Sequence, residues 1–166
     1  MPLPEVGAMK PMFAVLKANH MGHQVVAPQV YDAIGHPKLA NEPAWANTCA
    51  IRMSIALIAA GMKIRTGPAR LRINTGPHKG EQVEPSQRVL SDFLAKEIGQ
   101  PEKYKNATSA KNTIAWRRGI VSFFQIHGGA SRQGHIDLAS VQDWPRLMCS
   151  GSCYWNSVEV WFWPLK

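Results

Sequence analysis

One cysteine stands where a polar loop changes into an unbroken apolar segment, and this junction constrains the fold more than any other part of the chain. The segment from Cys49 to Ala60 has the composition of a buried helix. Asn47 or Thr48 can accept a hydrogen bond from an early backbone N–H, and Gly61 is suited to end the helix. Thiols in a first helical turn can ionise with pKa values of roughly 3.5–7.5 instead of about 8.5, since unpaired N–H groups and the helix dipole favour negative charge. Cys49 is therefore a candidate nucleophile, although a free cysteine often only packs in a core.

Length and composition predict one globular domain spanning residues 1–166. The chain has 166 residues, of which 45% are hydrophobic and 18% charged, and this balance is typical of a folded protein with a sizeable core. No run of 18 apolar residues is present, so no membrane span is expected. The segment from Met1 to Glu5 lacks a basic region followed by an apolar one, so no signal peptide is expected either.

The formal net charge of +8 predicts an anionic partner without identifying it. Nucleic acid, phospholipid headgroups and acidic cell-wall polymers would all be attracted to such a surface. The basic residues are scattered, and no long basic helix interleaved with aromatic residues appears. Direct binding of nucleic acid is therefore not expected.

The other two cysteines lie four positions apart, in Cys149-Ser-Gly-Ser-Cys153. This turn could bring the two sulfurs together, and closing so small a loop would contribute about 2 kcal/mol in the chain-entropy model. Three reduced thiols, or half of a zinc site, are the alternatives. Zinc would need two more ligands, and no second Cys pair or His-x-x-x-His is present, so neither a metal nor a cofactor is expected. A paired turn would leave Cys49 as the odd thiol.

The pattern along the chain predicts helices first and an antiparallel sheet afterwards, which is an α+β fold. Helices are expected over 10–19, over 49–60 and from Ser86 to about Ile98, with residues 20–43 as a loop and 67–85 as loops and short strands. Strands are expected over 119–126, 135–138 and 158–163, and the short connections between them favour antiparallel pairing.

A histidine and an aspartate share one face of the strand over 135–138. Since side chains alternate along a strand, His135 and Asp137 point to one side and Ile136 and Leu138 to the other. A polar face on an otherwise buried sheet indicates either a functional site or a solvent-exposed edge. Among the six histidines, His127 is the main competitor for the role of a general base.

Three segments together resemble a known family. They are the stretch from Asn47 to Ser54, the Gly-His strand from Gly129 to Leu138, and the turn from Cys149 to Cys153. The chain resembles the type VI secretion amidase effectors of the fourth family, which are cysteine peptidases with an NlpC/P60-like, papain-like fold. Weaker similarity, including Asn19-His20, extends over nearly the whole chain.

The resemblance implies N-terminal helices packed on a C-terminal antiparallel sheet, with Cys49 as nucleophile, His135 as general base and Cys149–Cys153 as a paired turn. In the family an aspartate between those two cysteines serves as the third catalytic residue, but this chain has serine and glycine there. Asp137 is the expected replacement, with Asp143 or Asn156 as alternatives. A backbone carbonyl or water could also orient the imidazole.

The implied activity is hydrolysis of the bond between γ-D-glutamate and meso-diaminopimelate in Gram-negative peptidoglycan stem peptides. The N–H groups of the first helical turn, including that of Cys49, are expected to stabilise the oxyanion. The family acts as an antibacterial effector: it is made in the cytoplasm, carried by the type VI apparatus and active in the periplasm of target bacteria. A cognate immunity protein is the expected partner in the producing cell. A Cys–His hydrolase or transamidase for another amide, and a non-catalytic basic wall-binding module, remain alternatives.

Overall fold

The computed structural model describes residues 9–22, 25–128, 133–143, 146–150 and 153–166. The helices are α1 (Phe13–Asn19), α2 (Ala27–Ile34), α3 (Cys49–Ala59), α4 (Gln87–Glu97) and α5 (Ala107–Ile114), with short 3-10 helices at Pro37–Asn41 and Pro43–Trp45. The strands are β1 (Leu71–Arg72), β2 (Gln82–Val83), β3 (Glu102–Tyr104), β4 (Gly119–Phe124), β5 (His135–Asp143), β6 (Arg146–Cys149) and β7 (Glu159–Pro164). Residues 1–5, on which the expected absence of a signal peptide rests, lie outside the described residues.

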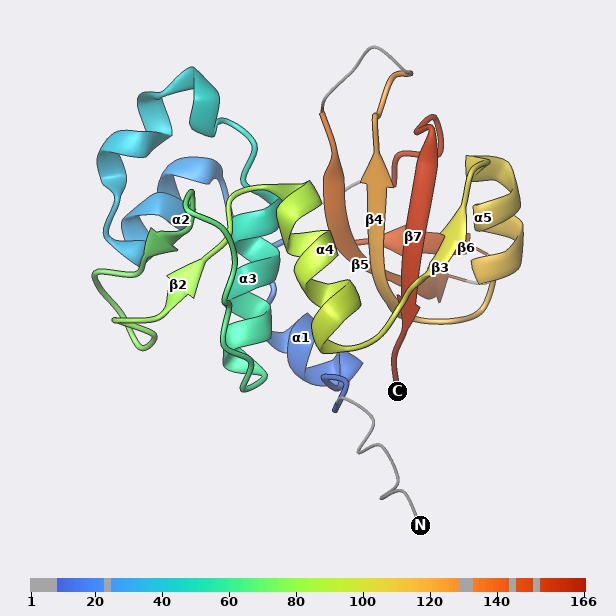
Figure 1. The fold of residues 1–166 in the computed structure, drawn as a ribbon, viewed down its shortest axis with the longest axis horizontal. Helices are drawn as coiled ribbons and strands as arrows, with labels where there is room; N and C mark the ends of the chain where they lie inside the picture. Colours follow the sequence, from blue (N-terminus) through green and yellow to red (C-terminus); the bar gives the residue numbers. More distant parts are fainter. Residues whose placement is uncertain (1–8, 23–24, 129–132, 144–145, 151–152) are drawn as a thin grey trace.

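The five larger strands form one antiparallel sheet in the order β3-β7-β4-β5-β6, and β1 pairs with β2 in a separate hairpin (Figure 1). Helices α1 to α4 lie on one side of the sheet, while α5 packs against β3 and β7. The prediction of an α+β fold, with N-terminal helices packed on a C-terminal antiparallel sheet, is confirmed. No helix in the described part of the chain is long and apolar enough to cross a membrane.

Alternation along β4 divides the interior into two cores. Ile120 and Phe124 point into the larger core, which α1 to α4 fill, while Val121 and Phe123 point into the smaller core beneath α5. Every residue of β4 is buried, which is why this strand reads as a continuous apolar run rather than an alternating one. The sheet therefore carries a packed layer on each face.

Helix α3 occupies the centre of the larger core. Ile51, Met53 and Leu57 are completely buried, and burial of such side chains contributes roughly 1.5–3 kcal/mol each. The predicted end of this helix is confirmed, since Gly61 follows it with a φ of +94°. The apolar contacts around α3 hold its N-terminus, and thereby Cys49, at a fixed place beside the sheet.

Two helices, α2 and α5, were not predicted from the sequence. Residues 20–43 form no single loop, because α2 lies within them, with Pro28 in its first turn and Gly35 in the left-handed conformation at its end. Helix α5 was also missed, although the Asn106 side chain caps it by accepting a hydrogen bond from Ser109 N–H. Both carry ordinary boundary residues, but each is only eight residues long, so neither has a long apolar repeat.

The edge of β5 is partly open, and this positions the site. Strand β6 pairs with β5 only from Ala139 onward, while β4 pairs with β5 on the inner side from His135. In the described residues, the segment from His135 to Asp137 therefore has a strand neighbour on one side alone. The N-terminus of α3 approaches this open segment.

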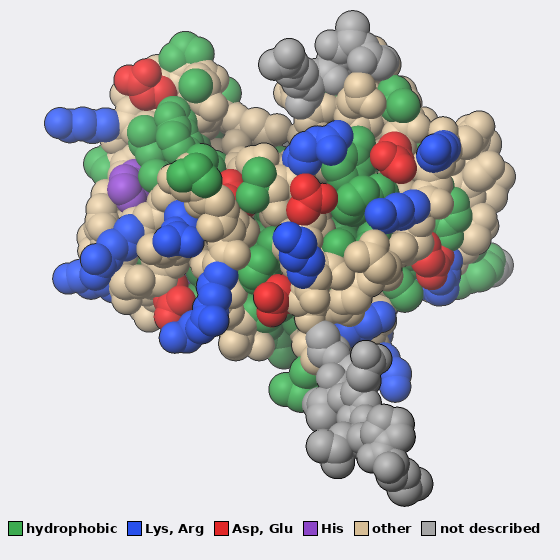
Figure 2. Space-filling view, in the orientation of Figure 1, with side chains coloured by type: hydrophobic (Ala, Val, Ile, Leu, Met, Phe, Trp, Pro, Cys, Tyr) green, Lys and Arg blue, Asp and Glu red, His purple; other side chains and the backbone are tan. Residues whose placement is uncertain are grey.

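Figure 2 shows how the charges are distributed over one face of the molecule. Lys and Arg side chains are spread over this face, with Asp and Glu side chains between them. This agrees with the scattered basic residues of the sequence and with the absence of a long basic stripe.

Candidate active site

The entry into α3 is fixed by a single side chain. Asn47 Oδ1 accepts a hydrogen bond from the backbone N–H of Cys49 at 3.1 Å, so Asn47 rather than Thr48 caps this end of the helix. The amide of Asn47 then donates from Nδ2 to the carbonyl of Gly134 at 3.0 Å. One residue thus joins the start of α3 to the residue that precedes β5.

The same contact changes the expected source of oxyanion stabilisation. The N–H of Cys49 already donates to Asn47 Oδ1, so another donor has to contribute to the stabilisation of a reacting carbonyl. The expectation that this N–H stabilises an oxyanion therefore stays a prediction, and it requires the N–H to exchange Asn47 Oδ1 for the substrate oxygen. Amide groups that line the pocket belong to Asn47 and Gln133.

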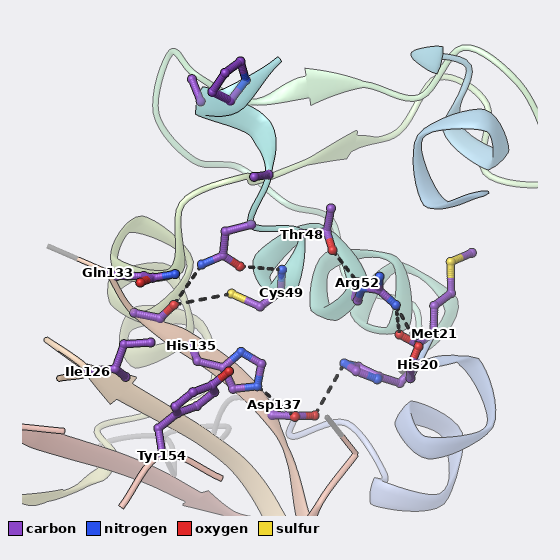
Figure 3. A pocket seen from close by; sticks show the side chains of 16 residues that line it. His20, Met21, Thr48, Cys49, Arg52, Ile126, Gln133, His135, Asp137 and Tyr154 are labelled. Atoms are coloured by element: carbon purple, nitrogen blue, oxygen red, sulfur yellow. Dashed lines mark hydrogen bonds and ion pairs between the residues drawn. The ribbon is translucent and has the colours of Figure 1, made fainter. Parts of the chain in front are cut away.

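Cys49 and His135 lie close together beside the two hydrogen bonds of Asn47 (Figure 3). Cys49 is a free thiol, 7% exposed, and its Sγ lies 3.9 Å from the Gly134 carbonyl oxygen. His135 Nε2 lies 2.9 Å from Asp137 Oδ2, so this nitrogen carries the hydrogen that the carboxylate accepts. The other ring nitrogen, Nδ1, is then the one available for proton exchange with Cys49.

The His135 ring is held by aromatic neighbours. Tyr154 meets it edge-on, with ring centroids 4.9 Å apart, and Phe123 stacks at 6.3 Å. Tyr154 follows directly on Cys153, which forms the disulfide with Cys149, so the predicted pairing of these two cysteines is confirmed. Edge-on and offset stacked pairs are favourable arrangements of aromatic rings, and here they restrict rotation of the imidazole.

The pKa of His135 is raised to about 9. Burial alone would lower it, because desolvation disfavours the imidazolium, but hydrogen bonds to Asp137 and Cys49 and the charges of these two groups outweigh burial. His135 is therefore an imidazolium at neutral pH. That state suits a proton donor to a leaving amine and a counter-ion to a thiolate.

Asp137 is enclosed by polar groups on two sides. Its side chain is 1% exposed, and Oδ1 accepts the backbone N–H of Leu138 at 2.8 Å. His20 Nε2, at the end of α1, lies 3.8 Å from the same oxygen, and the His20 side chain is 4% exposed. Nothing in the sequence separates His20 from the other loop histidines, because its position beside Asp137 arises only in the folded chain.

Arg52 connects these parts from the second turn of α3. Its Nη1 donates to the carbonyls of Met21 and Gly22 at 2.8 and 2.7 Å, and its Nε donates to Thr48 Oγ1 at 2.8 Å. Burial lowers the pKa of Arg52, while the nearby Cys49 and Asp137 act in the opposite direction. The guanidinium therefore adds positive charge near the thiol and the carboxylate.

Gly134 is required for space. A Cβ on this residue would lie 2.0 Å from Gln87 Oε1 and 3.0 Å from the carbonyl oxygen of Phe123. Gln87 cannot retreat easily, because its Nε2 donates to Ser122 Oγ at 2.6 Å and this hydroxyl also bonds to Ser91 Oγ at 2.7 Å. The close approach of α4 to Gly134 thus sets the position of the residue that precedes His135.

A pocket of about 440 Å³ opens in front of these groups. Its lining includes Pro43 and Ala44, the side chains of Ile126 and Tyr154, and the candidate pair Cys49 and His135. The described residues contain no cluster of three or more His, Cys, Asp or Glu that could hold a metal ion. The arrangement can perform acyl transfer by a thiol with an imidazole as proton carrier.

The other candidates for the site lie elsewhere. His127 is exposed, and its Nδ1 is bonded to Asn156 Nδ2 at 2.9 Å, so Asn156 contacts His127 rather than His135. The side chain of Asp143 is not among the described ones. Residues 129–132 and 151–152, which belong to the motifs, also lie outside the described residues.

The comparison with protein families gives one match over most of the chain. Residues 45–163 match the model described as Type VI secretion system (T6SS), amidase effector protein 4, or Tae4. Among curated proteins the sequence has no match.

Solved structures with the same fold support this match. The type VI effector Tae4 from Enterobacter cloacae has a TM-score of 0.76 and 23% identity, covering 96% of this chain and 99% of that one. The Tae4–Tai4 effector–immunity complex from Enterobacter cloacae has a TM-score of 0.74 and 23% identity, covering 95% of this chain and 100% of that one. The Tae4–Tai4 complex from Salmonella Typhimurium has a TM-score of 0.69 and 21% identity, again covering 95% of this chain and 100% of that one.

The raised pKa of His135 predicts a pH-dependent contribution to stability. A histidine with a folded pKa of about 9 and an unfolded pKa of about 6.5 stabilises the fold fully below pH 6.5, and this contribution is lost as the pH rises through about 9. The difference in unfolding free energy between the wild type and His135→Phe, measured with urea from pH 6 to 10, should therefore shrink with increasing pH. Phenylalanine keeps the ring contacts with Tyr154. A difference that stays constant over this range would contradict the assignment.

The crowding at Gly134 predicts a loss of activity on enlargement. Gly134→Ala must displace either Gln87 or the backbone before His135, and a displacement of about 1 Å near reacting groups can cost on the order of 10²-fold in rate. We expect amide hydrolysis to fall by roughly 10- to 100-fold. Gly67→Ala is the control, since nothing lies within 4 Å of a Cβ there. Equal activities of the two variants would show that the close approach is not needed.

Proposed function

The chain belongs to the family of type VI secretion amidase effectors of the fourth kind, and on this premise we propose that Cys49, His135 and Asp137 form the triad with which it hydrolyses peptidoglycan stem peptides. The bond cut is that between γ-D-glutamate and meso-diaminopimelate of Gram-negative peptidoglycan. The observation that carries the proposal is the free, buried thiol at the start of α3, which lines one pocket with an imidazole whose Nε2 is held by a buried carboxylate.

The reaction follows from these positions. Cys49 Sγ attacks the amide carbonyl as a thiolate. His135, which is protonated at neutral pH, is the proton donor for the leaving group. His135 gives its Nδ1 proton to the departing amine as the carbon–nitrogen bond breaks, which leaves a thioester on Cys49. A water molecule then loses a proton to His135 and hydrolyses the thioester, which restores the thiolate and the imidazolium.

Asp137 orients the imidazole. The oxyanion of the tetrahedral intermediate is stabilised by other groups, which donate hydrogen bonds to it. By accepting the Nε2 hydrogen of His135, the carboxylate keeps Nδ1 directed at the sulfur and stabilises the imidazolium. Since Cys49 N–H is held by Asn47 Oδ1, we assign to the oxyanion the side-chain amide of Gln133 and the second Nδ2 hydrogen of Asn47, the first being donated to Gly134. This chain lacks the family's aspartate between Cys149 and Cys153, and in our proposal Asp137, on the same strand as His135, takes its place.

The surface charge and the pocket fit this substrate. Each stem peptide carries several carboxylates, and the chain has a net charge of +8, so long-range attraction favours association with the wall. The pocket has both polar lining, from Asn47 and Gln133, and apolar lining, from Ile126 and Tyr154. Such a mixture suits a peptide backbone with short aliphatic side chains.

The family also sets the place of action and the partners. As a type VI effector that acts on peptidoglycan, the protein works in the periplasm of target bacteria after delivery by the secretion apparatus. The related Tae4 proteins of Enterobacter cloacae and Salmonella Typhimurium form complexes with Tai4 immunity proteins. We assign to this chain a cognate immunity protein in the producing cell that blocks access to Cys49.

Digestion of purified sacculi tests the activity. We expect the wild type to release fragments with a new amino terminus on meso-diaminopimelate and a new carboxyl terminus on D-glutamate, identified by mass spectrometry. Cys49→Ala should retain its fold by circular dichroism and lose essentially all of this activity, because removal of the nucleophile leaves no acyl acceptor. Intact stem peptides after wild-type digestion, or undiminished cleavage by Cys49→Ala, would refute the proposal.

A further inference from the structure

A second histidine faces the carboxylate that orients His135. His20 Nε2 lies 3.8 Å from Asp137 Oδ1, on the opposite side of the carboxylate from His135, and Figure 3 shows the two imidazoles flanking Asp137. The His20 side chain is 4% exposed and that of Asp137 is 1% exposed. At 3.8 Å the contact is that of an ion pair between an imidazolium and a carboxylate, and at this burial little water screens it.

The backbone around His20 is held from two directions. Its own N–H donates to the carbonyl of Leu16 at 2.8 Å, which attaches it to the end of α1. The next two carbonyls, of Met21 and Gly22, accept hydrogen bonds from Arg52 Nη1. Since Arg52 lies one turn after Cys49 on α3, the helix that carries the thiol also fixes the segment that carries His20.

The position of the carboxylate decides whether His135 is oriented. Asp137 Oδ2 accepts from His135 Nε2, while Oδ1 accepts from the Leu138 N–H. Rotation of the carboxylate away from this arrangement would break the contact with His135. His20 lies where it opposes such a rotation, and in the described part of the chain the charged or titratable groups around Asp137 include His20 from the end of α1, Arg52 from α3 and His135 from β5.

We propose that His20 is a positioning residue for Asp137, which holds the carboxylate through its Nε2 atom and thereby keeps the His135 ring directed at Cys49. This inference rests on the proposed function of the triad, and it adds a member from the N-terminal helix. His20 does not touch the substrate or the sulfur. Its effect reaches the thiol through Asp137 and His135.

Two substitutions separate this role from simple packing. His20→Phe keeps an aromatic ring of similar size and removes the nitrogen that faces Asp137. His20→Gln removes the ring and keeps an N–H donor at a similar distance from the backbone. Positioning through the carboxylate predicts activity in His20→Gln and a loss in His20→Phe, whereas a packing role predicts the reverse. His78→Phe and His78→Gln are the matched controls on a turn that does not line the pocket.

The experiment measures kcat and KM on a soluble stem peptide, and the rate at which iodoacetamide alkylates Cys49. We expect His20→Phe to lower kcat and the alkylation rate about tenfold, which corresponds to about 1.4 kcal/mol, with KM unchanged. His20→Gln should stay within about threefold of the wild type. In an Asp137→Asn background, His20→Phe should cause no further loss, because the group through which it acts is gone.

Three results would overturn the inference. They are wild-type kinetics in His20→Phe, a tenfold loss in His20→Gln, and an undiminished loss on top of Asp137→Asn. If His20→Phe fails to fold, His20→Gln and its double variant with Asp137→Asn decide the matter by the same criteria. The alkylation rate needs no peptidoglycan, so the inference can hold for the thiol and imidazole even if the wild type leaves stem peptides intact.

Discussion

The side chain of Asn47 joins two segments that are far apart in the sequence, and the geometry of the site depends on this contact. Through Oδ1 it holds the N–H of Cys49, and through Nδ2 it holds the carbonyl of Gly134, the residue before His135. The helix and the strand could each form without it. Their relative position fixes whether sulfur meets imidazole, and Gln87 lies so close to Gly134 that no Cβ fits there. The hydrogen bonds of Asn47 and the close packing of Gln87 at Gly134 together set the position of Cys49 relative to His135.

The open edge of β5 makes room for this meeting. Because β6 covers β5 only from Ala139 onward, the segment with His135 and Asp137 can be approached by α3 and by the end of α1. The buried carboxylate is then surrounded by His135, His20 and the guanidinium of Arg52, which offset the cost of removing it from water. The raised pKa of His135 is a consequence of the same enclosure, since it is bonded to Asp137 and Cys49 in a place where water cannot screen them.

The sequence predicted those parts that depend on local pattern. The apolar run after Cys49, Gly61 at its end and the alternation around His135 are local signals, and each led to the observed element. Short helices such as α2 lack a long apolar repeat and were missed. His20 could not be singled out, because its distance to Asp137 depends on how α1 packs against α3. Asn47 was one of two candidate caps in the sequence, and the structure shows that Asn47 holds the Cys49 N–H.

The central claim is that Cys49 and His135 act together as one catalytic pair, and the imidazole itself reports on it. Nitrogen-15 NMR of His135 in the folded protein, titrated from pH 5 to 10.5 in the wild type and in Cys49→Ala, measures the pKa directly. The account predicts a transition at about 9 in the wild type and a distinctly lower one in Cys49→Ala, because the hydrogen bond and charge of the sulfur are removed. The same transition in both proteins would contradict it, since the sulfur would then have no influence on the ring.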